Sequence, residues 1–234
     1  MPALGRHLEW LRPPFTVDTL FELTPTPLRY QVLEGELVVS PAAQPRHNLA
    51  ADRLRTLLAG AILAGAPTGD VEVIRNCAVR LPGGDGPTPD LIVTTADPEE
   101  TPRGIPAAQV HSVIEVISPP TTTAGRVTKT SLYTAANIPC YWRVELQPWW
   151  EHLCPVPAIV VRLLGPDLSW RTTLYPAGER ATLPLMIGHG ELTTVEIDPG
   201  TLVGRRPVPR SGPAPPIRPR PPSARSSDAA GTCR

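Results

Sequence analysis

Two acidic residues lie inside apolar segments that have the pattern of strands. Asp90 precedes the apolar residues of TPDLIVTT, and Glu115 lies at the centre of SVIEVIS, between valine and isoleucine residues. Consecutive apolar residues are typical of a strand that is covered on both faces. A carboxylate there is costly to bury unless a cation or hydrogen bonds compensate, so buried acids are candidates for chemistry. Two carboxylates would supply oxygen ligands to a hard cation such as Mg²⁺.

Lys129 is the one lysine among the 22 Lys and Arg residues of the chain. It lies in RVTKTSLY, four residues before Tyr133, so both side chains fall on one face of a predicted helix. This helix follows the Glu115 strand after a short loop and should pack back over the sheet, which would bring Lys129 near both carboxylates. An ammonium there would orient a water molecule and stabilise charge that develops on a phosphorus centre. Arginine is a poor substitute, because its guanidinium is bulky and keeps its proton.

Two structural alternatives stay open at this point. Glu115 would be a structural residue if it paired with an arginine such as Arg126 or Arg143, since ion-pair networks also bury acids. Lys129 would carry no function if it were simply the lysine that survives in an arginine-biased composition.

The elements that must position these residues include both helices and strands. The predicted helices cover residues 16–23, capped by Thr16, the greater part of 41–65, and about 123–137. A β-hairpin over 29–40 turns at Glu34-Gly35, strands follow over 70–81, 90–95, 112–118 and 140–146, and an antiparallel meander is built from 158–165, 169–176 and 192–203. The fold class is therefore mixed α and β, with helices flanking a sheet.

Several of these segments, in this order, resemble the Uma2 family of endonucleases. The resemblance is carried by RYQVLEGELVVSPAAQPRH, then PDLIV, then VIEVISPPT, and then Lys129 followed by LYTAANIPCYW, and it covers roughly residues 16–204. Uma2 proteins belong to the PD-(D/E)XK nuclease superfamily. The resemblance therefore implies a restriction-endonuclease-like core with a central mixed sheet, and metal-dependent hydrolysis of phosphodiester bonds.

The resemblance also implies roles for individual residues. Position 117, where the superfamily usually keeps its lysine, is Ile117 here, and Lys129 on the following helix takes its place. The expected site contains Asp90, Glu115 and Lys129 as catalytic residues, Glu36, Asp90 and Glu115 as ligands of Mg²⁺ or Mn²⁺, and His47 and Tyr133 as auxiliary residues.

Composition sets residues 1–204 apart from a Pro/Arg-rich tail, residues 205–234, and the resemblance implies that residues 1–204 form a single PD-(D/E)XK nuclease-like domain. The tail has almost nothing apolar to bury, which predicts disorder with polyproline-II character. It holds seven arginines and one acid, a net charge of +6, against −6 on residues 1–204. The tail would either contact anionic partners or serve as a solubilising extension. The acidic body counts against DNA as the substrate, because nucleic-acid-binding proteins usually present basic surface.

The sequence predicts a cytoplasmic protein without a membrane partner. The N-terminal segment MPALGRHLEWLRPPF lacks the continuous apolar region of a signal peptide, and no apolar run approaches the about 20 residues that span a bilayer. The four cysteines show no CxxC pair and no metal-ligand spacing, as expected for free thiols in a reducing compartment.

The leading hypothesis is a Mg²⁺-dependent endonuclease that acts on DNA. The alternative is a catalytically inactive nuclease-like module for binding or dimerisation, and a homodimer is open in either case. A metal-dependent hydrolase of another phosphoester would share the same site and differ in its substrate alone.

Overall fold

The fold is described from a computed structural model, which covers residues 13–23, 28–40, 42–65, 70–117, 123–149 and 153–205. The described residues up to Gly204 belong to one compact unit. The predicted tail lies outside the described residues beyond Arg205, and so does the side chain of Arg126. Within the described segments, no helix is long and apolar enough to cross a membrane.

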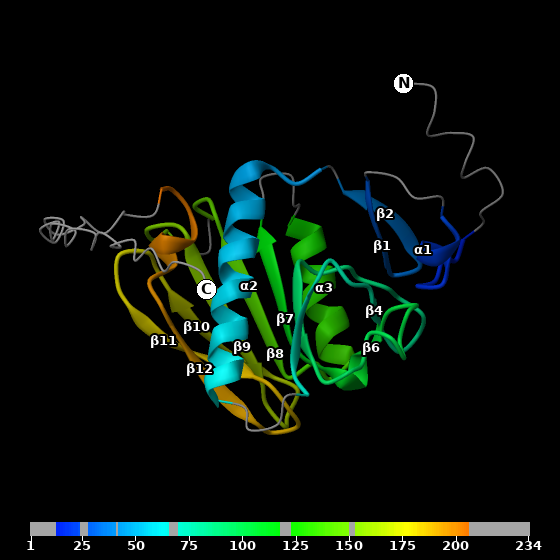
Figure 1. Cartoon of the computed structure of the whole chain (residues 1–234). Helices are drawn as coiled ribbons and strands as arrows, with labels where there is room; N and C mark the ends of the chain where they lie inside the picture. The colour runs from blue at the N-terminus through cyan, green and yellow to red at the C-terminus, as the bar shows by residue number, and fades with distance from the viewer. Residues whose placement is uncertain are drawn as a thin grey trace, which may run out of the picture. The chain divides into compact units, whose positions relative to one another are not determined.

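A six-stranded mixed sheet forms the centre of this unit (Figure 1). In spatial order its strands are β10 (Trp170–Tyr175), β9 (Ala158–Leu164), β8 (Cys140–Glu145), β7 (Val110–Ile117), β5 (Leu91–Thr94) and β3 (Glu72–Arg75). β7 and β8 run parallel, while the other neighbouring pairs are antiparallel. Parallel strands need a crossover, and the helix α3 (Thr123–Ala135) supplies it. All residues of β7 and β8 are buried, as expected for strands that are covered on both faces.

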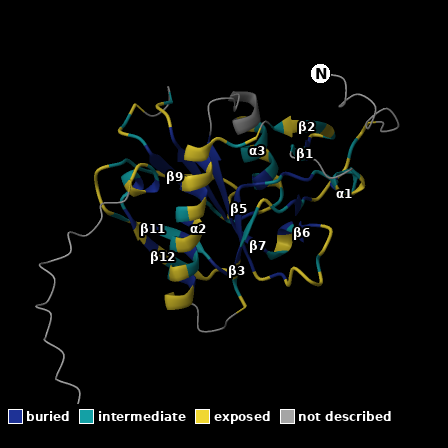
Figure 2. Ribbon diagram, turned by 45° about the horizontal axis from the view of Figure 1, so that its top comes forward, coloured by how far each residue is buried: buried dark blue, intermediate teal, exposed yellow. Residues whose placement is uncertain are grey.

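The helix α2 (Pro45–Gly65) covers one face of the sheet (Figure 1). Its residues Leu54 and Leu58 are fully buried and belong to one apolar cluster with Ile114 and Trp142 of the sheet. The hairpin of β11 (Ala181–Met186) and β12 (Leu192–Ile197) contributes to the same cluster. The outward face of α2 is exposed, as the yellow segments in Figure 2 show. α2 is therefore amphipathic, with its apolar face toward the sheet.

The helix α3 belongs to the opposite face of the sheet. Its residue Tyr133 is fully buried in a second apolar cluster, together with Val113 of β7 and Tyr141 of β8. Side chains alternate along a strand, so Val113 faces α3 whereas Ile114 faces α2. By the same alternation Glu115 lies on the α3 face, where Lys129 and Tyr133 can reach it.

A two-stranded hairpin, β1 (Arg29–Leu33) and β2 (Glu36–Ser40), is attached to the loop that leads into β5. Its turn residues Glu34 and Gly35 have φ values of 54° and 73°, the left-handed backbone that a two-residue hairpin turn requires. Val32 and Gly86 exchange two backbone hydrogen bonds of 3.0 Å, which fasten the hairpin to the loop. The remaining short elements are α1 (Thr19–Glu22), β4 (Val79–Arg80), β6 (Ile105–Pro106), η1 (Ala107–Gln109) and η2 (Pro199–Leu202).

The structure confirms the mixed α and β class with helices on both faces of the sheet, and it differs from the sequence prediction at α1, at β3 and β4, and in the C-terminal strands. The helix predicted over 16–23 is the single turn α1, preceded by Asp18, so Thr16 is not its cap. The strand predicted over 70–81 divides into β3 and β4 because Asn76, with a φ of 49°, has a left-handed backbone that interrupts a strand.

The strands expected to form one C-terminal meander are distributed over two sheets. β9 and β10 extend the central sheet, whereas β12 pairs with β11 in a separate hairpin. The sequence pattern did not predict β11, because Pro184 lies inside it and proline argues against a strand.

Candidate active site

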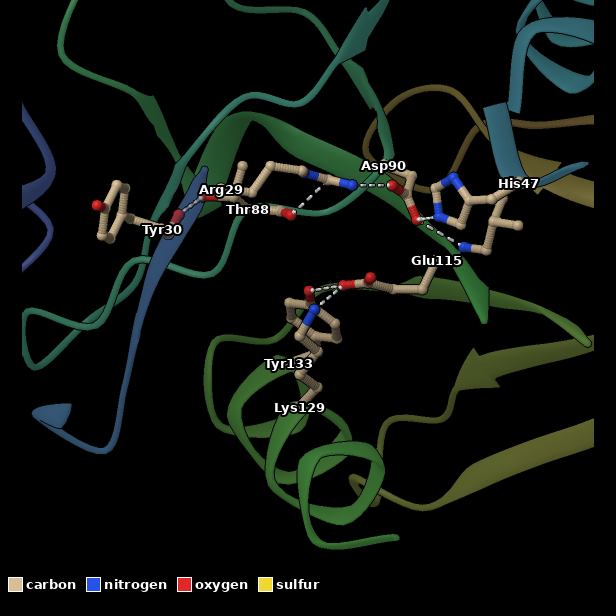
Figure 3. A network of polar contacts seen from close by, with 9 residues as sticks. Arg29, Tyr30, His47, Thr88, Asp90, Glu115, Lys129 and Tyr133 are labelled. Atoms are coloured by element: carbon tan, nitrogen blue, oxygen red, sulfur yellow. Dashed lines mark hydrogen bonds and ion pairs between the residues drawn. The ribbon is translucent and has the colours of Figure 1, made fainter. Parts of the chain in front are cut away.

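Asp90 directly precedes β5 and is 3% exposed. Its Oδ1 atom accepts a hydrogen bond of 2.9 Å from Nη1 of Arg29, and its Oδ2 atom accepts one of 2.8 Å from the backbone N–H of Val116. Nε2 of His47 lies 3.2 Å from the same Oδ2 atom. Figure 3 shows Arg29 and His47 on opposite sides of the carboxylate. Three separate elements, β1, α2 and β7, therefore converge on one side chain.

These contacts favour the ionised form of Asp90. Burial opposes ionisation, but the hydrogen bond from His47 and the charges of His47 and Arg29 outweigh it, with a further contribution from the Val116 N–H. Together they hold the pKa of Asp90 below its ordinary value of 3.8. Asp90 is therefore a carboxylate near neutral pH despite its burial.

Glu115 lies in the buried strand β7 and is 6% exposed. Its Oε1 atom accepts hydrogen bonds from two side chains of α3, 2.7 Å from Nζ of Lys129 and 2.9 Å from the hydroxyl of Tyr133 (Figure 3). Lys129 and Tyr133 can share this acceptor because residues four apart lie on the same face of a helix. Val116, which holds Asp90, is the next residue of the strand, so the two carboxylates are anchored at adjacent positions of β7.

Lys129 and Tyr133 both lie away from bulk water. The side chain of Lys129 is 14% exposed, and Tyr133 is fully buried. Burial, followed by the charge of Glu115, raises the pKa of Tyr133 well above 10.0. Tyr133 is therefore a neutral phenol whose hydroxyl donates a hydrogen bond to the Glu115 carboxylate.

Arg143, one of the arginines considered as a partner of Glu115, is paired with Glu115 in the register of β7 and β8. Its Nε atom lies 2.7 Å from Oε1 of Glu145, and both of these side chains are 3% exposed. The α3 face of the sheet thus buries a second ion pair beside Glu115. The side chain of Arg126, the other arginine considered, lies outside the described residues.

The contacts of Arg29 and His47 depend on tertiary packing. The sequence singled out His47 as an auxiliary residue, and the structure buries it against Asp90 in the first turn of α2. Arg29 was not singled out, although it begins the hairpin segment that carries the family resemblance. No local pattern marks Arg29, since its partner Asp90 is 61 residues away in the chain.

The structure does not bring Glu36 to the other predicted metal ligands. Glu36 is exposed and pairs with Leu33 beside the hairpin turn, whereas Arg29, which reaches Asp90, pairs with Ser40 at the open end. These ends lie four residue steps apart along the strand, a backbone distance of about 13 Å. The structure thus places Asp90, Glu115 and Lys129 around adjacent residues of β7, and Glu36 apart from them.

The donor set around β7 fits a magnesium-like cation bound mainly by substrate and water. Among the described residues, no cluster of three or more His, Cys, Asp or Glu side chains could hold a metal ion. Mg²⁺ commonly takes one or two carboxylates from a protein and completes its shell with water and substrate phosphates. Asp90 and Glu115 supply that number of carboxylates. In addition, the buried Nδ1 atom of His47 has no hydrogen-bond partner within the described part of the chain.

Comparisons with known proteins identify a family for this chain and a solved structure with a similar fold. Residues 17–187 match the family described as "Uma2: Putative restriction endonuclease". Among solved structures, a similar chain is a "putative nuclease belonging to DUF820" from Anabaena variabilis, with 15% sequence identity and a TM-score of 0.55. The similarity covers 74% of this chain and 89% of the Anabaena chain, and at this identity it shows the fold alone. Among curated proteins, none matches.

Proposed function

Because the chain belongs to the Uma2 family of restriction-endonuclease-like proteins, we propose that it is a metal-dependent endonuclease that hydrolyses phosphodiester bonds of DNA. Asp90 and Glu115 are its metal ligands, and Lys129 is the catalytic cation. Tyr133 and His47 hold the two carboxylates in position.

One observation carries this proposal: the 2.7 Å contact between Nζ of Lys129 and Oε1 of Glu115, beside the residue that anchors Asp90. Two carboxylates and an ammonium at one point of a buried strand are costly for a purely structural purpose. The same three groups are what phosphodiester hydrolysis needs, namely anionic ligands for a metal and a fixed positive charge for the developing phosphorane.

The side chains divide the work as follows. Glu115 and the helix α3 hold the Lys129 ammonium in place, from where it orients the attacking water and stabilises charge on the phosphoryl oxygens. A divalent cation held by Asp90 and Glu115 would supply Lewis acidity toward the phosphate. Tyr133 donates to Glu115 and His47 contacts Asp90, so neither carboxylate can rotate freely. The displacement is in line and requires no covalent intermediate with the protein.

DNA is the proposed substrate even though residues 1–204 carry a net charge of −6. A divalent cation would offset this charge locally at the site. Residues 205–234 carry a net charge of +6, and their arginines would add salt-dependent attraction to the phosphates of the DNA.

The test is cleavage by the purified full chain of double-stranded DNA, single-stranded DNA and RNA, each with Mg²⁺ or Mn²⁺ and with EDTA. We expect metal-dependent cleavage of DNA that Lys129→Met slows by about 100-fold or more, the usual cost of removing a fixed charge at a transition state. Lys129→Arg should cleave DNA little faster than Lys129→Met, because the guanidinium differs from an ammonium in shape and hydration.

Arg180→Met is the matched control, since Arg180 is 74% exposed and pairs with Glu196 away from the site. It should cleave at the wild-type rate. Wild-type cleavage by Lys129→Met would refute the catalytic role of the lysine. Cleavage of another phosphoester but no nucleic acid would refute DNA as the substrate while retaining the site.

One observation favours a second candidate, a catalytically inactive binding module. Each carboxylate already has a cationic partner from the protein, Arg29 for Asp90 and Lys129 for Glu115. Metal binding separates the two candidates. Calorimetry should detect Mn²⁺ binding that Asp90→Ala abolishes if the chain is a nuclease, and no such binding if it is an inactive module.

A further inference from the structure

Each carboxylate of the candidate active site is paired with a cationic side chain of the protein itself. Two carboxylates, Asp90 and Glu115, face one guanidinium and one ammonium at distances of 2.9 Å and 2.7 Å. A divalent cation that enters this site meets two fixed positive charges at the atoms it must bind. Like charges in a partly buried site repel strongly, because the effective dielectric constant there is low.

Of the two cations, Arg29 is the one that can leave. Its side chain is 28% exposed, compared with 14% for Lys129, which is held on a helix that packs over the sheet. Its second contact, from Nη2 to the carbonyl of Thr88, is 3.5 Å long and therefore weak.

Asp90 does not depend on Arg29 for its position. The backbone N–H of Val116 and the ring of His47 both contact its Oδ2 atom, while Arg29 occupies Oδ1. Departure of the guanidinium would therefore expose Oδ1 of a carboxylate that is already oriented.

The hairpin that carries Arg29 is also fastened without this side chain. The two Val32–Gly86 backbone hydrogen bonds hold β1 to the loop, and Oγ1 of Thr88 donates 3.1 Å to the carbonyl of Tyr30. At the other end of the hairpin, the backbone N–H of Gly35 donates a hydrogen bond of 3.0 Å to Oδ1 of Asp85. The side chain of Arg29 can swing while the backbone of β1 stays in place.

We propose that Arg29 is a cation gate that covers Oδ1 of Asp90 in the metal-free protein and pairs with a phosphate of the nucleic acid once a metal has displaced it. This inference rests on the proposed function, since it assigns the metal to Asp90. A guanidinium presents a planar fork of donors that matches phosphate as well as carboxylate, so one side chain can serve both partners. Metal alone then binds weakly, and metal and nucleic acid bind cooperatively, because the phosphate accepts the guanidinium that the metal releases.

The experiment measures Mn²⁺ affinity by calorimetry without nucleic acid, for the full-length wild type, Arg29→Gln and Arg29→Lys. We expect Arg29→Gln to bind Mn²⁺ at least 5-fold more tightly than the wild type, the lower end of usual coupling between sites. Arg29→Lys, which keeps the charge, should stay closer to the wild type. Circular dichroism and thermal melting check that each variant is folded.

Arg80→Gln is the matched control. The side chain of Arg80 is 33% exposed and donates a hydrogen bond of 3.0 Å to the carboxylate of Asp18. It therefore resembles Arg29 in exposure and in its partner but lies outside the site. Its loss should leave Mn²⁺ affinity unchanged, which would show that the effect of Arg29 is local.

A second measurement uses the same variants with a fluorescent DNA duplex and saturating Ca²⁺, read by anisotropy. Arg29→Gln should bind the duplex at least 5-fold more weakly, because the guanidinium no longer reaches a phosphate. Tighter metal binding together with weaker DNA binding is the signature of the gate, since a merely structural role would weaken both.

Mn²⁺ affinity of Arg29→Gln equal to or below that of the wild type overturns the gate, and so does absence of Mn²⁺ binding in both proteins. Absence of Mn²⁺ binding would refute the proposed function as well, whereas a wild type that binds Mn²⁺ but cleaves no nucleic acid would refute the proposed function alone. In that case tighter Mn²⁺ binding together with weaker DNA binding by Arg29→Gln would still establish the gate.

Discussion

At the scale of single residues, the Oε1 atom of Glu115 joins the sheet to α3 through hydrogen bonds. It accepts from a charged donor, Lys129, and a neutral donor, Tyr133. Lys129 has a proposed catalytic role, whereas Tyr133 acts through Glu115 and is a positioning residue. Hydrogen bonds to charged groups contribute more than those between neutral groups, so each donor should have a measurable effect.

Removal of the Tyr133 hydroxyl should destabilise the protein while keeping its packing. Tyr133→Phe loses one hydrogen bond to a buried carboxylate, and we expect the free energy of unfolding to fall by about 2 kcal/mol. Urea denaturation followed by circular dichroism measures this change. A double-mutant cycle with Glu115→Ala, which removes both acceptor oxygens, should give a coupling energy of at least about 1 kcal/mol. Additive effects in the cycle would contradict the contact.

At the scale of elements, α2 joins the core of the fold to the candidate site. It buries Leu54 and Leu58 against the sheet and carries His47 in its first turn, next to Asp90. On the other face of the sheet, α3 carries Tyr133 and Lys129, which both donate to Glu115. Each helix is fixed by apolar packing along one face, and this packing determines where its polar residue meets the sheet.

Two leucines of α2 offer a matched test of this packing. Leu54→Ala should lower the free energy of unfolding by about 3 kcal/mol, because Leu54 is 0% exposed and its truncation leaves a cavity. Leu63→Ala on the same helix should change it by no more than about 0.5 kcal/mol, since Leu63 is 83% exposed. Chemical denaturation of both variants makes the comparison. Equal losses would contradict the observed orientation of the helix.

At the scale of the whole molecule, a buried histidine away from the candidate site should make stability depend on pH. His111 at the start of β7 is 1% exposed, lies 3.0 Å from Oγ1 of Thr95, and forms an edge contact with the ring of His189 at 5.1 Å. Burial, followed by the charge of His189, lowers the pKa of His111 below 6.5. The unfolded chain therefore binds a proton at a higher pH than the native protein does.

The free energy of unfolding should consequently decrease as the pH falls from about 6.5 toward the lowered pKa of His111 in the native state. Below that pKa both states are protonated, and this contribution to the slope ends. Denaturation of wild type and His111→Gln at pH 7.5 and pH 5.5 measures it. The variant should lose less stability between these two values. An equal loss in both proteins would exclude His111 as the source.

Much of the fold and part of the site follow from local patterns in the chain. Apolar runs around Asp90 and Glu115 predicted β5 and β7, and the four-residue spacing predicted that Lys129 and Tyr133 share a helix face. These predictions succeed because strand alternation and helix periodicity depend on neighbours in sequence alone. The same reasoning did not predict β11, since Pro184 interrupts its strand pattern.

The sequence by itself determined which strands carry the two carboxylates and which helix face presents the lysine, because backbone geometry fixes these over a few residues. Only the tertiary structure decided that Arg29 and His47 meet at Asp90, so that the open end of the hairpin, and not the turn beside Glu36, reaches the site. The physical reason is that such contacts join segments tens of residues apart. Their positions are fixed when the hairpin and α2 pack against the sheet, and no local periodicity encodes that packing.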